Sequence, residues 1–191
     1  MANANNPNGL SPVNSILGAA FSGRIGRYYV PSTDTTAIYI GGVVVPAGSA
    51  DANGIMSVTG NCTTGAIVIG VVTGVELVTR ESTIYRAAST ERYLYVADDP
   101  NTIFEVQDDN SATPAATDVG NVFDLTAQAT GSTVTGRSSI QISWTSKTAT
   151  GDGTEDVMVI GMVQRPNLTL GANSRWLVKL TNHYFNQDLG K

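Results

Sequence analysis

From Tyr28 onward, hydrophobic and polar side chains alternate along the chain with a period close to two. This period is typical of β-strands, in which successive side chains point to opposite faces of a sheet. Turn-forming residues, mainly glycine, proline, asparagine and aspartate, separate the alternating segments. The segments predicted to form strands are residues 27–31, 37–48, 55–59, 66–78, 82–88, 92–97, 102–107, 121–127, 138–146, 156–164 and 175–182.

Short strands at this spacing predict an all-β protein, with a sandwich or a barrel over residues 28–191. No stretch of ten or more residues shows the 3.6-residue period of a capped helix, so we expect little helix. Asn53-Gly54 predicts a tight hairpin turn between two strands. Residues 110–139 are rich in Thr and Ser and flank one short strand candidate, which indicates a long loop or a β-arm.

Residues 1–27 are predicted to form an extended N-terminal arm in front of this domain. Asn, Gly, Pro and Ser dominate the segment, and its prolines and glycines disfavour a helix or a long strand. The arm also contains Val13, Ile16, Leu17 and Phe21, which a wholly disordered tail would not need. Two arrangements remain open: the arm folds back on its own domain, or it lies across a neighbouring subunit.

Charged residues make up only 14% of the chain, whereas about 25% is usual in soluble domains. Small polar residues replace them, which suits surfaces that pack against another molecule. The formal net charge of -5 disfavours nucleic-acid binding. The charge is uneven, because acids gather within 91–124 while residues 1–33 contain Arg24 and Arg27 and no acid.

The longest apolar run, residues 66–78, is too short to cross a bilayer and is interrupted by Gly70 and Glu76. The first residues lack the charged and apolar regions of a signal peptide. Cys62 is the only cysteine, so an intrachain disulfide is impossible. We therefore expect a soluble protein that is made in the cytoplasm and has no membrane partner.

The densest carboxylate group lies in YLYVADDPNTIFEVQDDNS, which contains Asp98, Asp99, Asp108 and Asp109. The two alternating segments in this stretch predict a hairpin, with the first aspartate pair in its turn and the second pair at the far end. About five residues at roughly 3.3 Å each would separate the pairs by about 15 Å, too far to share one metal ion. We interpret these aspartates as residues that end strands.

Other catalytic or metal-binding chemistry lacks the necessary residues. No EF-hand loop is present, although a looser calcium site built from Asp152, Glu155 and Asp156 remains open. His183 is the only histidine, so a two-histidine metal site cannot form in the monomer and a structural hydrogen-bonding role is favoured. No nucleophile elbow, P-loop or dinucleotide-binding motif appears. We predict a protein that is not an enzyme and that has no cofactor.

The candidate interface residues lie in the arm and at the start of the first predicted strand. Arg24 and Arg27 are basic, Phe21 is apolar, and Tyr28 and Tyr29 are amphipathic in the way that is common at protein interfaces. The basic arm could pair with the acidic segment of an adjacent copy or with another partner. Alternatively, the tyrosines are half-buried strand residues.

Several segments occur in an order that points to a known family: NPNGLSPV, YYVPSTDTTAIYIGGVVVPAGSADANGIMSV, IVIGVVTG, YRAASTERYLYVADDPNTIFEVQDD and RWLVKLTNHY. Together they resemble the capsid cement proteins of tailed bacteriophages, also called head decoration proteins. The resemblance covers most of the chain and is weakest across 110–145. Strand and turn patterns carry it, rather than a chemical signature.

The resemblance implies a β-sandwich or jelly-roll module on the outside of an icosahedral capsid, in the virion. It also implies two partners, the major capsid protein and further copies of the chain in homotrimers, and a role in bracing the expanded shell. Two alternatives remain: another virion β-module of the tail or head fibre, or a carbohydrate-binding module. The carbohydrate alternative favours exposed tryptophans, whereas Trp144 and Trp176 lie in apolar strand patterns that predict burial.

Overall fold

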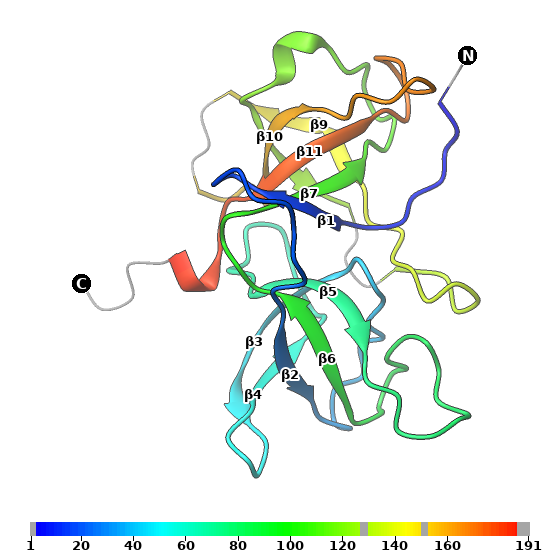
Figure 1. The fold of residues 1–191 in the computed structure, drawn as a ribbon, viewed down its shortest axis with the longest axis vertical. Helices are drawn as coiled ribbons and strands as arrows, with labels where there is room; N and C mark the ends of the chain where they lie inside the picture. The colour runs from blue at the N-terminus through cyan, green and yellow to red at the C-terminus, as the bar shows by residue number, and fades with distance from the viewer. Residues whose placement is uncertain (1–2, 127–129, 150–152, 187–191) are drawn as a thin grey trace.

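The computed structural model describes residues 3–126, 130–149 and 153–186 (Figure 1). These residues form eleven strands and two 3-10 helices of one turn each. The predictions of an all-β fold and of little helix are therefore confirmed. The elements are β1 (Ser11–Ser15), β2 (Gly26–Val30), β3 (Val43–Ala50), β4 (Met56–Thr59), β5 (Gly70–Val75), β6 (Arg92–Ala97), β7 (Thr102–Gln107), η1 (Ala116–Asp118), β8 (Val122–Leu125), β9 (Ile142–Thr148), β10 (Val157–Met162), β11 (Arg175–Leu180) and η2 (Tyr184–Asn186).

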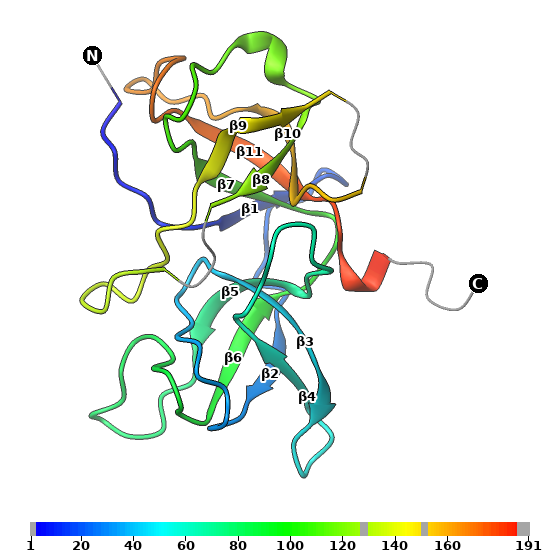
Figure 2. The same ribbon diagram turned by 180° about the vertical axis from the view of Figure 1, so that it is seen from behind.

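The strands form one open sheet and one closed barrel, which occupy the two ends of the molecule (Figures 1 and 2). The six-stranded sheet has the order β1-β7-β11-β10-β8-β9, and each neighbouring pair is antiparallel. The five-stranded barrel has the order β2-β4-β3-β5-β6, with β6 returning to β2. The turn predicted at Asn53-Gly54 joins β3 to β4, and Gly54 takes the positive φ of 81° that such a turn requires.

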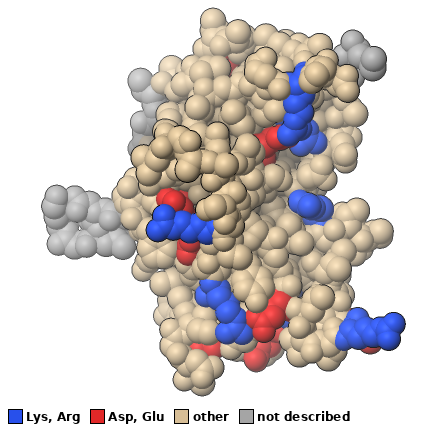
Figure 3. All heavy atoms as spheres, in the orientation of Figure 1, with Lys and Arg blue, Asp and Glu red and all other residues tan. Residues whose placement is uncertain are grey.

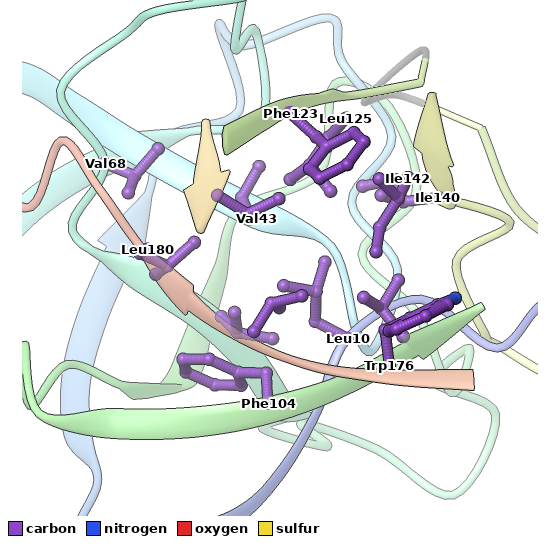
Figure 4. Packing of buried hydrophobic residues seen from close by; sticks show 14 of the residues in the cluster. Leu10, Val43, Val68, Phe104, Phe123, Leu125, Ile140, Ile142, Trp176 and Leu180 are labelled. Atoms are coloured by element: carbon purple, nitrogen blue, oxygen red, sulfur yellow. The ribbon is translucent and has the colours of Figure 1, made fainter. Parts of the chain in front are cut away.

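Sheet and barrel share one hydrophobic core (Figure 4). Val43 and Val68 from the barrel side pack with Phe104, Trp176 and Leu180 from the sheet. A second core fills the barrel interior, with residues such as Val30, Val44, Val58 and Leu94 at its centre. Because the two sheets pack together around buried apolar side chains, the sandwich-like architecture predicted from the strand pattern is confirmed.

The barrel is inserted between two neighbouring strands of the open sheet. β1 pairs with β7, while β2 to β6, which lie between them in sequence, all belong to the barrel. The predicted hairpin of β6 with β7 is therefore wrong, because β6 pairs with β2 and β5 and β7 pairs with β1 and β11. Alternation predicts a strand but not its partner, and residues 98–101 connect the barrel to the open sheet rather than forming a hairpin turn.

Residues 3–27 fold onto their own chain, which is the first of the two arrangements considered for the arm. β1 pairs with β7, and Leu10 is buried in the shared core. The side chain of Asn3 donates to the carbonyl oxygens of Thr169 and Ala172. β1 was not predicted as a strand, because the prolines and glycines around it obscure a pattern of only five residues.

Two other predicted segments differ from the expected strands. Residues 82–88 form only an isolated bridge between Arg86 and Ile38, because the Arg86 side chain turns inward to hold two loops. Within 110–139, β8 joins the open sheet between β10 and β9, η1 precedes it, and the other described residues form loops and isolated bridges. The prediction of a long loop in this region falls partly on residues 127–129, which lie outside the described residues.

Close contact between β5 and β6 makes Gly70 a sensitive position. A Cβ atom on Gly70 would lie 2.1 Å from the carbonyl oxygen of Ala97. We expect Gly70→Ala to lower the free energy of unfolding by about 1–3 kcal/mol, because the two strands must move apart. Gly161→Ala in β10 is the control, since a Cβ there meets nothing within 4 Å. Urea denaturation measures both variants, and equal small losses would contradict the expectation.

Candidate interaction surface

The outer face of β2 and β6 carries an aromatic and charged cluster. The register places Arg27 opposite Tyr95 and Tyr29 opposite Tyr93. Alternate residues of the same strands, such as Leu94, fill the barrel core, so these four side chains point outward. We call Arg27, Tyr29, Tyr93 and Tyr95, together with the acids Glu76 and Asp51 that bind them, the β2–β6 surface.

Arg27 is held in place by one acid and one aromatic ring. Its Nε and one terminal nitrogen donate to the two carboxylate oxygens of Glu76, at 2.9 and 3.2 Å. The guanidinium carbon lies 3.6 Å from the centre of the Tyr93 ring, a cation–π distance. The hydrogen bond to Glu76 raises the pKa of Arg27. The positive charge is therefore fixed in position although the side chain is exposed.

Tyr93 is fixed in the same way. Its hydroxyl donates to Asp51 at 2.6 Å, and its ring lies 5.5 Å from the ring of Tyr29. The tyrosine hydroxyl, together with the backbone N–H groups of Ile55 and Asn53, lowers the pKa of Asp51 to about 2. Asp51 is therefore a carboxylate at neutral pH. The surface presents rings and charges in one defined arrangement, which suits recognition of another molecule.

A groove lies where the connection from β6 to β7 meets the segment between β1 and β2. The side chain of Arg24 pairs with Asp99 at 3.4 Å, and the Tyr28 hydroxyl donates to Asp98 at 2.8 Å. A hollow of about 340 Å³ lies here, and an adjoining hollow of about 170 Å³ shares part of its lining. We call the two hollows together the end groove; its lining includes Leu17, Phe21, Arg24, Asp98, Asp99, Asn101 and Phe185.

The five interface residues predicted from the sequence lie in the same region but have different roles. Arg27 and Tyr29 belong to the β2–β6 surface, and Arg24 lines the end groove. Tyr28 points into the barrel core, and Phe21 is partly buried against the shared core. Within the chain, Arg24 pairs with Asp99, whereas the predicted pairing of the basic arm with an adjacent copy or another partner stays a prediction.

Sequence reasoning missed the two acids that organise the surface. Glu76 lies at the end of β5 and Asp51 lies in the β3–β4 turn, so neither is near Arg27 in sequence. The alternation of Tyr93 and Tyr95 does indicate one outward face of β6. Their partners, Glu76 and Asp51, come close to them only when the barrel closes. In Figure 3, positive and negative side chains likewise meet in small groups on an otherwise uncharged face.

The four aspartates of the stretch 93–111 end strands, as predicted. Backbone N–H groups two residues further on donate to the side chains of Asp99, Asp108 and Asp109. Asp108 is fully buried and also accepts from the Ser174 hydroxyl. Within the described part of the chain, no group of three or more His, Cys, Asp or Glu side chains could hold a metal ion.

The remaining calcium alternative concerned Asp152, Glu155 and Asp156. Asp152 lies outside the described residues. Asp156 is buried, and its carboxylate accepts from the backbone N–H groups of Gly65 and Leu125. Burial raises the pKa of Asp156, and these two bonds oppose the rise. Asp156 therefore joins the barrel side to the sheet side of the protein, which is a structural role.

His183 is also structural, and its burial makes the stability of the protein depend on pH. Its Nδ1 accepts from the N–H of Phe185, and burial lowers the pKa of the imidazole below 6.5, against the opposing effect of Asp98 and Asp99. The unfolded chain therefore binds a proton more readily than the folded one below pH 6.5. This contribution to stability is present above that pH and is lost as the pH falls.

We expect the wild type to lose more stability than His183→Asn when the pH falls from about 7.5 to 5.5, measured by urea denaturation. The asparagine Oδ1 can accept the same N–H bond but does not titrate. All other titratable groups are common to the two proteins, so the difference reports on His183. Parallel pH profiles would contradict this expectation.

Comparison with models of protein families, with curated proteins and with solved structures finds no match to this chain. Among the residues that the structure describes, no helix is long and apolar enough to span a membrane.

Proposed function

We propose that this protein is a structural virion component that binds the outer surface of an icosahedral phage capsid and stabilises the expanded shell. The order of strand and turn segments that resembles capsid cement proteins supports this role, and the all-β fold is compatible with it. A protein that binds only the expanded arrangement stabilises that arrangement by mass action. Many symmetric copies make a modest affinity at each site sufficient.

The observation that carries the proposal is the β2–β6 surface. Tyrosine and arginine are the residue types that most often supply binding energy at protein interfaces, together with tryptophan. Here Arg27 and Tyr93 are already held by Glu76 and Asp51, so little side-chain entropy is lost on binding. An exposed cluster that is ordered before binding is suited to docking on a protein shell.

The carbohydrate-binding alternative receives no support from the tryptophans. Trp144 and Trp176 are buried, with 2% and 0% of their surfaces exposed, as the sequence predicted. A tail or head-fibre role remains the rival to be tested, since it would use a similar β-module in contact with different virion proteins.

Co-sedimentation of the purified protein with expanded capsids that lack it tests the proposal. Unexpanded procapsids are the control. Saturable binding to expanded shells and a raised shell melting temperature are expected. Absence of binding to both kinds of shell would contradict the proposal and favour the tail-module alternative.

The β2–β6 surface should be needed for this binding. We expect the double variant Arg27→Ala with Tyr29→Ala to bind expanded shells about 30-fold more weakly, which corresponds to about 2 kcal/mol for an interface hot spot. Arg165→Ala is a matched control, since Arg165 also makes two bonds to one glutamate, Glu105, on the open sheet. Equal binding by the double variant and by the Arg165→Ala control would show that the β2–β6 surface is not part of the interface.

A further inference from the structure

The chain contains two Asn-Gly pairs, Asn8-Gly9 and Asn53-Gly54, in very different surroundings. Asparagine is one of the thermally labile residues, and an Asn-Gly pair is chemically reactive. Glycine has no side chain, so its backbone nitrogen can approach the carboxamide of the preceding asparagine and displace ammonia from it. In a folded protein this reaction requires a backbone that is free to bring the two reacting atoms together.

The pair Asn53-Gly54 has this freedom. Both residues are exposed at the tip of the β3–β4 turn, which projects from the barrel (Figures 1 and 2). A Cβ atom on Gly54 would meet nothing within 4 Å. The Gly54 N–H donates to the carbonyl oxygen of Asp51 at 3.1 Å, and the Asn53 amide donates to the Asp51 carboxylate at 3.3 Å. These distances lie near and beyond the upper end of the usual range, so the restraint is weak.

The pair Asn8-Gly9 is packed on both sides of its backbone. Gly9 is buried, and a Cβ atom on it would lie 2.5 Å from the carbonyl oxygen of Gly41. The next residue, Leu10, donates its N–H to that same oxygen and buries its side chain in the shared core. Rotation of this backbone would have to displace close-packed neighbours. The molecule therefore contains the same reactive pair in a free setting and in a locked one.

We propose that Asn53 is a site of spontaneous modification, at which the side-chain amide becomes a carboxylate without an enzyme. The Gly54 nitrogen forms a bond to Cγ of Asn53, the Cγ–Nδ2 bond breaks, and ammonia leaves with the proton of the Gly54 nitrogen. Water then opens the cyclic imide. Addition of water at Cγ gives aspartate, and addition at the backbone carbonyl carbon gives isoaspartate. The net reaction consumes water and releases ammonia, and no group is oxidised or reduced.

The modification changes the β2–β6 surface through Asp51. The Asp51 carboxylate accepts from the N–H groups of Asn53 and Ile55, both at 2.8 Å, and from the Tyr93 hydroxyl. Isoaspartate adds a main-chain atom between these two N–H groups, so both cannot keep their places at Asp51. Aspartate replaces an amide that donates to Asp51 with a second carboxylate. Either product weakens the anchor of Tyr93, whichever partner the surface binds.

Mass spectrometry of tryptic peptides, after incubation of the purified protein at mildly alkaline pH, tests the modification. Asn8 falls in the peptide of residues 1–24 and Asn53 in the peptide of residues 28–80, and fragment ions locate each change. We expect Asn53 to convert at least about tenfold faster than Asn8, a modest difference in barrier height. In urea the two pairs should convert at similar rates. Equal rates in the folded protein, or an Asn53 that converts only in urea, would overturn the proposal.

Hydrogen exchange of the Ile55 amide, measured by NMR, tests the effect on the surface. We expect faster exchange and shifted Tyr93 ring signals in incubated wild type than in fresh wild type. Asn53→Gln is the control, because its longer side chain forms the cyclic imide far less readily, and it should keep its fresh spectrum. Asn53→Asp separates the added charge from the added main-chain atom, and its Ile55 amide should stay protected. Unchanged Ile55 and Tyr93 signals in a converted sample would overturn the link to the β2–β6 surface.

Discussion

Replacing Arg86 by methionine is expected to lower the free energy of unfolding by about 3–5 kcal/mol, the cost of removing one partner of a buried ion pair. The Arg86 side chain is fully buried at one end of the barrel. Its guanidinium donates to the carbonyl oxygens of Pro31, Asp34, Thr36 and Thr90, at 2.6 to 2.8 Å. It also lies 3.6 Å from the Asp34 carboxylate.

The cost is large because methionine fills the space but supplies no donors. The carbonyl oxygens of Thr36 and Thr90 would lose the guanidinium donor, and the Asp34 carboxylate would lose its cation. The carbonyl oxygens of Pro31 and Asp34 would each keep a backbone N–H donor. Each lost partner inside the barrel end carries a desolvation penalty. Burial lowers the pKa of Arg86, and the Asp34 carboxylate opposes this effect. The network thus holds the segment 31–36 against residues 86–90 and fixes the base of the loop that follows β5.

Urea denaturation followed by circular dichroism measures the effect. Arg80→Met is the matched control, because Arg80 lies on the same loop but is exposed, and a change below about 0.5 kcal/mol is expected there. Arg86→Lys should fall between the two, since an ammonium has three donors where the guanidinium has five. A loss in Arg86→Met as small as that in the control would contradict the proposed role of this network.

Trp176→Ala is expected to cost about 3–5 kcal/mol, as for other buried aromatic residues reduced to alanine. Trp176 is the largest fully buried side chain and lies in the core shared by sheet and barrel. Its ring centre is 4.7 Å from that of Trp144, which is 4.5 Å from that of Phe123. Removal of the ring leaves a cavity in the middle of this aromatic row.

The indole also has a polar role. Its N–H donates to the Ser174 hydroxyl, which in turn donates to the buried Asp108 carboxylate. Trp176→Phe keeps one aromatic ring and removes the N–H together with the rest of the indole, so it should lose less stability than Trp176→Ala. Equal losses in the two variants, measured by urea denaturation, would show that the hydrogen bond rather than packing dominates.

The sequence was sufficient to predict strands wherever alternation was long and its ends were marked by turn residues. β6, β7 and β11 lie within the predicted segments, and the Asn53-Gly54 turn was found because a short loop fixes its own geometry. Strand partners were not predictable, as the wrong β6–β7 hairpin shows. Pairing depends on contacts between distant residues, and an alternating pattern fits many partners equally well.

Only part of the candidate interaction surface was predictable from the sequence, because its contacts also join residues that are distant in sequence. Arg27 and Tyr29 could be identified by residue type, since arginine and tyrosine are common at interfaces. Glu76 holds Arg27 in position, and Asp51 holds Tyr93, whose ring contacts both Arg27 and Tyr29. These two acids reach the surface only because β5 pairs with β6 and the β3–β4 turn approaches Tyr93.

The insertion of the barrel between β1 and β7 imposes an order on folding during synthesis. β1 leaves the ribosome early, but its partner β7 is not translated until the whole barrel segment, residues 26–97, has been made. At about 5–20 residues per second, β1 remains without its partner for several seconds. The barrel strands pair with one another, so the barrel can form first, and β7 then pairs with β1, which becomes the edge strand of the open sheet.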